Sequence, residues 1–444
     1  MKRYLAAIFT VLISFSASAQ SSDSVKQSNW SDHFQLTVIS QKHPSFAAKY
    51  SGANSLSDSA EPTATSLTAT LFIGRKLWKG AAFYFNPEVS GGKGLSFAKG
   101  VAGALNGETY RVGEVAPQVF IARAYFQQSI PLGTKIEEME DGINQIREMM
   151  PANRITITAG KFAISDFYDD NAYSKDPRTQ FFNWALWANG SWDYPANTRG
   201  YTFGVITELI KPAWALRLST VAVPRIANFH LMEYNLHAHS ETLEFQHTIL
   251  VNNRKGNVRI MASGTYSRAP SYADGIKAIA DNNRYLLNVI NGSVENNKYG
   301  GSKYGLGFNI DQEISNDIGF FARAGWNDGK YVSWAFTEID RTVSAGFSIK
   351  GNIWKRTGDI LGIAGALNDI SPGHKTFLAE GGYGFIIGDG KLNYGREQII
   401  EAYYNAQLSS FLWLTLDYQF VKDPGYNKDR GPVNVFGIRG HIEL

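Results

Sequence analysis

Cysteine is missing from the sequence altogether, since none occurs among its 444 residues. This excludes a disulfide scaffold and any metal site with cysteine ligands. A run of about 18 consecutive apolar residues is also missing beyond the N-terminal region, so no transmembrane helix is predicted. The formal net charge is only +3, and nothing favours nucleic acid as a partner. We expect no cofactor and no metal.

Catalytic signatures are missing too, because no GxSxG, HExxH, GxxxxGK[ST] or EF-hand pattern occurs. Among the eight histidines, only His237 and His239 lie close together, a spacing that places both on one face of a strand. We interpret them as part of an external loop rather than as a metal or catalytic pair. The chain is therefore not expected to be an enzyme.

Residues 1–19 are typical of a secretory signal peptide. Lys2 and Arg3 form its charged start, an apolar stretch follows, and an Ala-Ser-Ala cleavage site ends it. The apolar stretch is too short to span a bilayer. We expect the protein to be exported and to consist of one domain over residues 20–444.

Glycine and aromatic residues, by contrast, are abundant, with 43 Gly, 22 Tyr, 27 Phe and 10 Trp in a chain of mean hydropathy −0.22. A transmembrane β-barrel has this profile, because its strands alternate apolar side chains outward with polar ones inward and carry aromatic girdles. Such alternation is visible near residues 116–129, where Arg123 opposes an apolar face made of Phe120, Ala122, Ala124 and Phe126.

Short and long connections between the predicted strands alternate along the chain. This is typical of barrels in which short periplasmic turns alternate with long external loops. Residues 368–397 are interpreted as one long external loop, because a strand at 377–387 would make the strand number odd. One connection on the short side, 130–153, is predicted to be a helical insertion. The expected fold is an all-β, antiparallel transmembrane barrel of sixteen strands, near 33–41, 66–78, 81–90, 117–129, 154–164, 199–210, 213–223, 240–252, 256–268, 302–314, 317–328, 341–351, 359–367, 398–409, 412–422 and 433–444.

The segment from Gly160 to Gly204 is too polar for a strand in its middle, yet it is rich in rings. Long loops are usually functional or disordered, and disorder avoids aromatic residues. We expect residues 165–198 to fold into the barrel and narrow it, because nine rings outside would form an exposed apolar patch. Phe181 and Phe182 are interpreted as packing on the wall. Sugar C–H faces pack on rings and sugar hydroxyls suit charged and amide groups, so the candidates for meeting a solute are Asp176, Arg178, Trp184, Trp187, Asn189, Trp192 and Asp193.

Arginines fall on the inner face of five predicted strands. Arginine cannot lose its proton and would be costly against lipid, so these positions are assigned to the inside. The alternative for each is a pairing with neighbouring wall charges. We expect the pore to be lined, in contact with its solvent, by Arg123, Arg217, Arg259, Arg323, Glu401 and Arg439.

Four segments resemble those of carbohydrate-selective outer-membrane porins of the OprB family. The resemblance implies passive, carbohydrate-selective diffusion of sugars across the outer membrane into the periplasm, and it extends over most of the mature chain. The segments are DFYDDNAYSKDPRTQFFNWALWANGSWDYPANTRGYTFG (166–204), GFFARAGWNDGKYVSWAFTEID (319–340), YGFIIGDGKLNYGREQIIEAYY (383–404) and NKDRGPVNVFGIRGHIEL (427–444).

The expected partners follow from the membrane setting. They are small sugars as solutes, outer-membrane lipid and lipopolysaccharide, and the barrel-assembly machinery, because apolar alternation continues to Leu444 as in a sorting signal. A monomer and a homotrimer both fit. Two other functions stay open: a porin for organic acids or other small anions, with the arginines as an anion ladder, and a barrel enzyme or adhesin.

Overall fold

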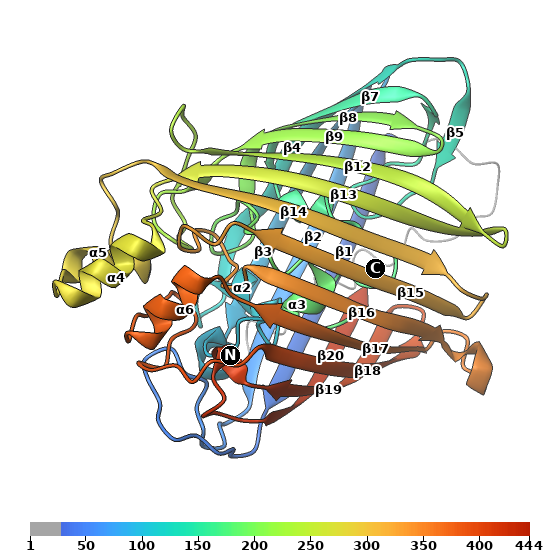
Figure 1. Cartoon of the computed structure of the whole chain (residues 1–444). Helices are drawn as coiled ribbons and strands as arrows, with labels where there is room; N and C mark the ends of the chain where they lie inside the picture. Colours follow the sequence, from blue (N-terminus) through green and yellow to red (C-terminus); the bar gives the residue numbers. More distant parts are fainter. Residues whose placement is uncertain (1–27) are drawn as a thin grey trace.

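Sixteen antiparallel strands form one closed barrel in the computed structural model, which describes residues 28–444 (Figure 1). Each strand pairs with its neighbours along the chain, and the last pairs with the first. All sixteen predicted strands are confirmed, while the expected signal peptide at 1–19 lies outside the described residues. The strands are β1 Trp30–Lys42, β2 Ala64–Trp78, β3 Ala81–Gly92, β4 Gln118–Pro131, β7 Arg154–Phe162, β8 Thr202–Lys211, β9 Trp214–Val221, β12 His239–Val251, β13 Arg254–Ser267, β14 Gly301–Glu313, β15 Ile318–Asn327, β16 Arg341–Lys350, β17 Ile360–Asp369, β18 Glu397–Ser409, β19 Leu412–Lys422 and β20 Val433–Glu443.

The two faces of the wall follow the alternation in the sequence. On β19, Leu414 and Leu416 are exposed on the outer face, whereas Thr415 and Asp417 are buried inside. Successive side chains of a strand point to opposite faces, so an apolar outer band and a polar interior arise from the same residues. Between residues 28 and 444, no helix has the length and apolar character needed to cross a bilayer.

One predicted face is wrong over half of β4. The register with β3 shifts where β3 presents Pro87, which has no N–H for the ladder, and Ala122 is left without a partner. Beyond this bulge the alternation is inverted, so Val119 and Ile121 point outward with 76% and 45% exposure. Phe120 belongs instead to the inner side, where its ring lies 6.1 Å from that of Tyr201.

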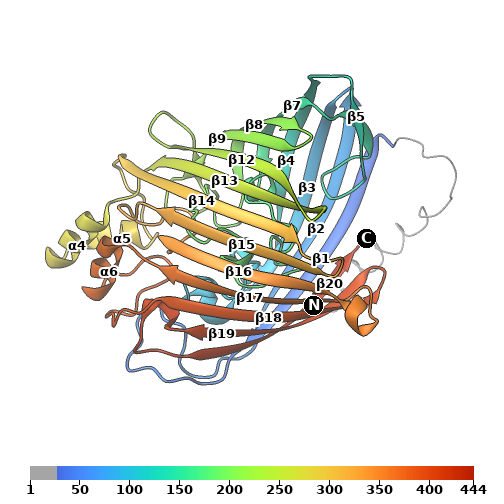
Figure 2. The ribbon, with the colours of Figure 1, turned by 45° about the vertical axis from the view of Figure 1, so that its right-hand side comes forward.

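Long connections gather at one end of the barrel and short turns at the other, as Figures 1 and 2 show. The long-loop end carries α4 (Tyr272–Ala280), α5 (Arg284–Ile290) and α6 (Pro372–Ala379). Helix α6 starts with Ser371 as N-cap and Pro at the first position. It lies within the predicted loop 368–397, which is confirmed as a connection: β17 ends at Asp369, β18 begins at Glu397, and no barrel strand lies between them.

The connection 130–153 is a hairpin and not the predicted helix. Strands β5 (Ile136–Met139) and β6 (Glu148–Pro151) pair with each other in an antiparallel sheet. Glu, Met and Arg are good helix formers, but the helix propensities of ordinary residues differ only by tenths of a kilocalorie per mole, roughly, and tertiary contacts override this preference. Ion pairs of Glu137 with Arg154 and of Glu138 with Arg147 hold the hairpin.

Smaller elements complete the chain. They are the short helices η1 Leu95–Ala98, α2 Thr109–Val112, η2 Ile164–Asp166, α3 Trp184–Trp187, η3 Gly351–Trp354 and η4 Pro424–Tyr426, and the two-stranded sheet of β10 Val223–Pro224 with β11 Met232–Glu233.

Candidate functional site

The segment 163–201 between β7 and β8 fills the inside of the barrel, as predicted from its rings. Asn183 caps the short helix α3 by accepting a hydrogen bond from the Ala185 N–H. The ring of Phe181 packs edge-on against Tyr403 of β18 at 4.9 Å between centroids. Phe181 is fully buried, so the interpretation of this residue as wall packing agrees with its position.

Two polar wall residues hold the backbone of this segment. Glu401 of β18 accepts hydrogen bonds from the N–H groups of Phe182 and Asn183 at 2.5 and 2.9 Å. Arg439 of β20 donates from one nitrogen to the carbonyls of Pro177 and Gln180, both at 2.7 Å. Backbone groups away from water need such partners, and the wall supplies them.

Asp169 is the centre of a second set of contacts. Arg323 of β15 donates to its carboxylate at 3.0 Å and also to the carbonyls of Leu186 and Ser174. The Asn189 N–H donates to the same carboxylate at 2.8 Å. The side chain of Arg323 is 0% exposed, so it lies beneath the segment and does not face solvent as expected.

Arg178 anchors the segment to the opposite part of the wall. Its guanidinium lies 3.0 Å from Glu88 of β3 and 3.1 Å from Glu108, with 5% of the side chain exposed. It also donates to Thr70 of β2 at 3.0 Å. The bonds of Arg178, Arg323 and Arg439 thus fix the segment to widely separated strands.

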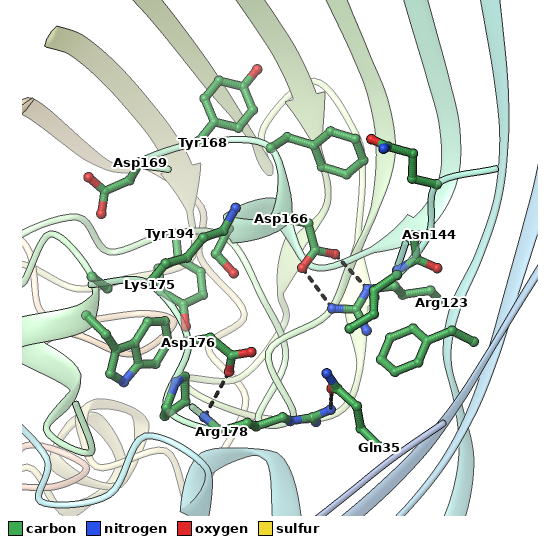
Figure 3. Close-up of a pocket in the computed structure, with 18 of the residues that line it drawn as sticks. Gln35, Arg123, Asn144, Asp166, Tyr168, Asp169, Lys175, Asp176, Arg178 and Tyr194 are labelled. Atoms are coloured by element: carbon green, nitrogen blue, oxygen red, sulfur yellow. Dashed lines mark hydrogen bonds and ion pairs between the residues drawn. The ribbon is translucent and has the colours of Figure 1, made fainter. Parts of the chain in front are cut away.

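A cavity of about 370 Å³ remains between the segment and the wall (Figure 3). The Arg123 guanidinium and the Asp166 carboxylate form a two-pronged ion pair on one side, at 2.6 and 2.8 Å. The polar and charged side chains that line the cavity are Gln35, Arg123, Gln127, Asn144, Gln145, Ser165, Asp166, Asp169, Lys175, Asp176 and Arg178, and its rings are Phe72, Tyr125, Phe167, Tyr168, Trp187, Trp192 and Tyr194.

Every cation of the lining is paired with a carboxylate. Arg123 pairs with Asp166, Lys175 with Asp170, and Arg178 with Glu88 and Glu108. Rings and neutral amides supply most of the remaining lining residues. Such a cavity offers hydrogen-bond donors, acceptors and apolar planes together, and none of its cations lacks a carboxylate partner.

The model of a protein family described as "Carbohydrate-selective porin, OprB family" matches residues 59–444 of this chain. The chain belongs to this family. It is therefore an outer-membrane porin, a channel rather than an enzyme, and the resemblance noted in four segments is confirmed. A search of curated proteins finds no match.

Solved structures agree on the fold. Pseudomonas putida OprB, in a structure determined at high pH, is 15% identical, covers 94% of both chains and has a TM-score of 0.68. The outer membrane channel DcaP of Acinetobacter baumannii is 10% identical, with 94% of this chain and 97% of that chain covered and a TM-score of 0.51. These likenesses show a shared barrel architecture.

The predicted site residues of this OprB-family porin divide into two groups. Five line the cavity, namely Arg123, Asp176, Arg178, Trp187 and Trp192. The others do not line it: they are Trp184, Asn189 and Asp193 in the segment itself, and Arg217, Arg259, Arg323, Glu401 and Arg439 on the barrel wall.

Asp193 shows what the second group does. Its carboxylate accepts hydrogen bonds from the N–H groups of Trp334 and Phe336, both at 2.8 Å, and lies 3.3 Å from the Lys303 ammonium. It therefore fixes the external loop after β15. Arg259 and Arg217 are paired in the wall, Arg259 with Asp311 at 2.5 Å and Arg217 with two glutamates.

Sequence reasoning missed several cavity residues. Asp166 and Lys175 belong to the polar run already singled out, and their charges were the available signal. Asn144 and Gln145 come from the connection 130–153, and a helical interpretation gave no reason to place them in the pore. His237 lies in the connection before β12, as expected, while His239 is the first residue of that strand.

Proposed function

We propose that this porin is a passive channel for neutral saccharides and that the cavity beneath segment 163–201 is its narrow, solute-binding section. The pairing of each lining cation with a carboxylate, Arg123 with Asp166, Lys175 with Asp170 and Arg178 with Glu88, carries the proposal. A site for anions would keep an excess of positive charge, since unpaired charges of one sign attract the opposite one. Paired charges instead present donors and acceptors to a solute that carries no net charge.

Sugar chemistry fits the rest of the lining. Hydroxyl groups both donate and accept hydrogen bonds, and the carboxylate, guanidinium and amide groups of the cavity offer both roles. Trp192 lines the cavity, and its indole N–H has no hydrogen-bond partner among the described residues. A buried donor without a partner is costly, and a sugar hydroxyl would satisfy it.

The arginines weigh against an organic-acid channel. Arg123, Arg217, Arg259 and Arg323 each lie within ion-pair distance of a carboxylate. Arg439, the fifth, is fully buried and donates to the carbonyls of Pro177 and Gln180, so the five form no ladder of positive charge open to the solute. No feature of the cavity favours an adhesin or a barrel enzyme.

Blocking of ion current by solutes tests the proposal. Purified protein in planar bilayers is titrated with neutral mono- and disaccharides and with sugar acids of the same size. Neutral sugars should block the current at lower concentration than the acids. Stronger block by the acids would refute a neutral-sugar channel.

Two matched tryptophan variants assign the block to the cavity. Trp192→Phe keeps a ring but removes the unpartnered N–H, and it should weaken sugar block about fivefold, the size of one hydrogen bond. Trp184→Phe is the control, because Trp184 is equally buried in the same segment but does not line the cavity. Equal effects of the two variants would remove Trp192 from the binding site.

The proposal also includes the expectations for export, assembly and oligomeric state. Residues 1–19 act as an export signal, and 20–444 form the mature porin domain. The barrel-assembly machinery inserts the chain, and its exposed apolar band contacts lipid and lipopolysaccharide. The protein works as a monomer or a homotrimer. Mass spectrometry and light scattering on protein from outer membranes test the first and last points.

A further inference from the structure

The hairpin of β5 and β6 lies at the short-turn end of the barrel, opposite α4, α5 and α6 (Figures 1 and 2). Short turns of outer-membrane barrels face the periplasm, so this hairpin belongs to the periplasmic mouth. The turn between its strands carries Ile146, which is 2% exposed. Ile146 lies against the inner face of β2, where a Cβ on Gly74 would approach it to 3.0 Å.

The turn is fastened to the inner wall by polar contacts with three strands. The Asn86 amide of β3 donates to the Asn144 side-chain oxygen at 2.9 Å. His33 of β1 lies 3.1 Å from the Asp141 carboxylate. Lys76 of β2 and Glu148 of the hairpin form an ion pair at 2.8 Å. Contacts of this kind make the turn a fixed part of the mouth.

The tip of the turn reaches the solute cavity. Ile143, Asn144 and Gln145 line the same space as segment 163–201, and Figure 3 shows Asn144 on the side of the cavity that holds Arg123. Asn144 adopts a left-handed backbone with φ of 54°, a conformation that Asn tolerates better than most residues. Its side-chain oxygen is occupied by Asn86, while its amide nitrogen donates to no described residue.

We propose that the hairpin turn, residues 140–147, is a second, periplasmic constriction that binds the solute from below while segment 163–201 binds it from above. The amide groups of Asn144 and Gln145 hydrogen bond to hydroxyls of a neutral, polyhydroxylated solute. This inference rests on the proposed sugar channel and adds to it a specificity element outside the inward segment.

Absence of native cysteine allows a direct test of the position of the tip. A water-soluble, charged thiol reagent is added to Gln145→Cys channels in planar bilayers, first on one side and then on the other. Modification should reduce the single-channel conductance, and it should be faster from the short-turn side. Met149→Cys is the control, because Met149 lies on the same hairpin with 45% exposure but does not line the cavity.

Solute contact is tested with two variants at the same hydrogen bond. Asn144→Gly keeps the left-handed turn but removes the amide, and it should weaken sugar block about fivefold, the size of one hydrogen bond. Asn86→Ala breaks the same bond from the wall side and leaves the Asn144 amide in the cavity, so it should weaken block less.

The outcomes separate this proposal from the function on which it rests. Unchanged conductance after modification of Gln145→Cys, an equal loss in Met149→Cys, or equal effects of Asn144→Gly and Asn86→Ala would overturn it. Sugar block of the wild-type channel and its weakening in Trp192→Phe are measured independently. If the wild-type block and its weakening in Trp192→Phe are observed while the hairpin variants behave as wild type, the proposed sugar channel is supported and the second constriction is refuted.

Discussion

Replacement of Arg323 by methionine should release the inward segment. Arg323 donates to the Asp169 carboxylate and to the backbone carbonyls of Asp169, Leu186 and Ser174, with distances from 2.6 to 3.2 Å. Methionine keeps most of the length of the side chain but none of these bonds. The Asp169 carboxylate is 6% exposed and would lose its ion-pair partner.

The size of the effect follows from this burial. Removing one partner of a buried ion pair costs about 3–5 kcal/mol, because the other charge remains without compensation. At about 1.4 kcal/mol for each factor of ten, the displaced state of the segment should gain roughly two to three and a half powers of ten in population. The hydrogen-bonded strands of the wall are not changed, so the barrel should stay folded.

Single-channel recording and trypsin cleavage report this release. Arg323→Met channels should show a higher mean conductance and more open-channel noise, and trypsin should cut at Lys175 or Arg178. Arg254→Met is the control, since Arg254 forms its pairs at the barrel rim with 32% exposure, where an ion pair contributes little. The double variant Arg323→Met, Asp169→Asn should recover part of the loss, because it no longer buries an unpaired charge.

Wild-type noise and full trypsin resistance in Arg323→Met would refute the reasoning. The segment would then be held by its other anchors alone, and the interpretation of Arg323 as an anchor would fail.

Two further predictions concern the loops. Deleting residues 176–194 should raise conductance and abolish sugar block together; unchanged values of both would place the selective section elsewhere. Burial alone would lower the pKa of His374 in α6, but its hydrogen bonds to Asp340 and Glu338 outweigh this and raise the pKa above the ordinary 6.5. The protonated ring therefore stabilises α6 fully below pH 6.5, and this contribution is lost as the pH rises through the raised pKa. Amide exchange in α6, corrected for intrinsic rates, should lose protection over that window in the wild type but not in His374→Gln; constant protection in the wild type would contradict the prediction.

Most of the wall could be predicted from the sequence, because the alternation within each strand indicates which of its residues point outward and which point inward. Leu416 and Asp417 are adjacent, and one must point out and the other in. The exception on β4 depends on Pro87 of the neighbouring strand, which displaces the register at Ala122. A periodicity within one strand contains no information about such a partner.

The site was harder to predict. The alternation in a strand indicates on which side of the wall a residue lies, but not whether that residue borders the cavity or is covered by another segment. Arg123 and Arg323 carry the same signal, a mid-strand arginine on the inner face. Arg123 borders the cavity, whereas Arg323 is covered by segment 163–201. Only the path of that segment separates them, and it is fixed by contacts across the whole barrel. The hairpin tip was missed for the same reason, since contacts with Asn86 and Gly74 decide the conformation of residues 140–147.

Anchoring and selectivity are therefore linked in this porin. A polar segment inside a barrel needs partners for its backbone and its charges, and the inward arginines and glutamates provide them. Once Arg323 is paired with Asp169 and Arg178 with Glu88, little unpaired positive charge is left to attract anions. The pairing of the charges around the cavity thus follows from the way the segment is held. Variants that break these pairs should shift the channel from neutral-sugar preference toward ion selectivity, cationic where an arginine is removed and anionic where its carboxylate is.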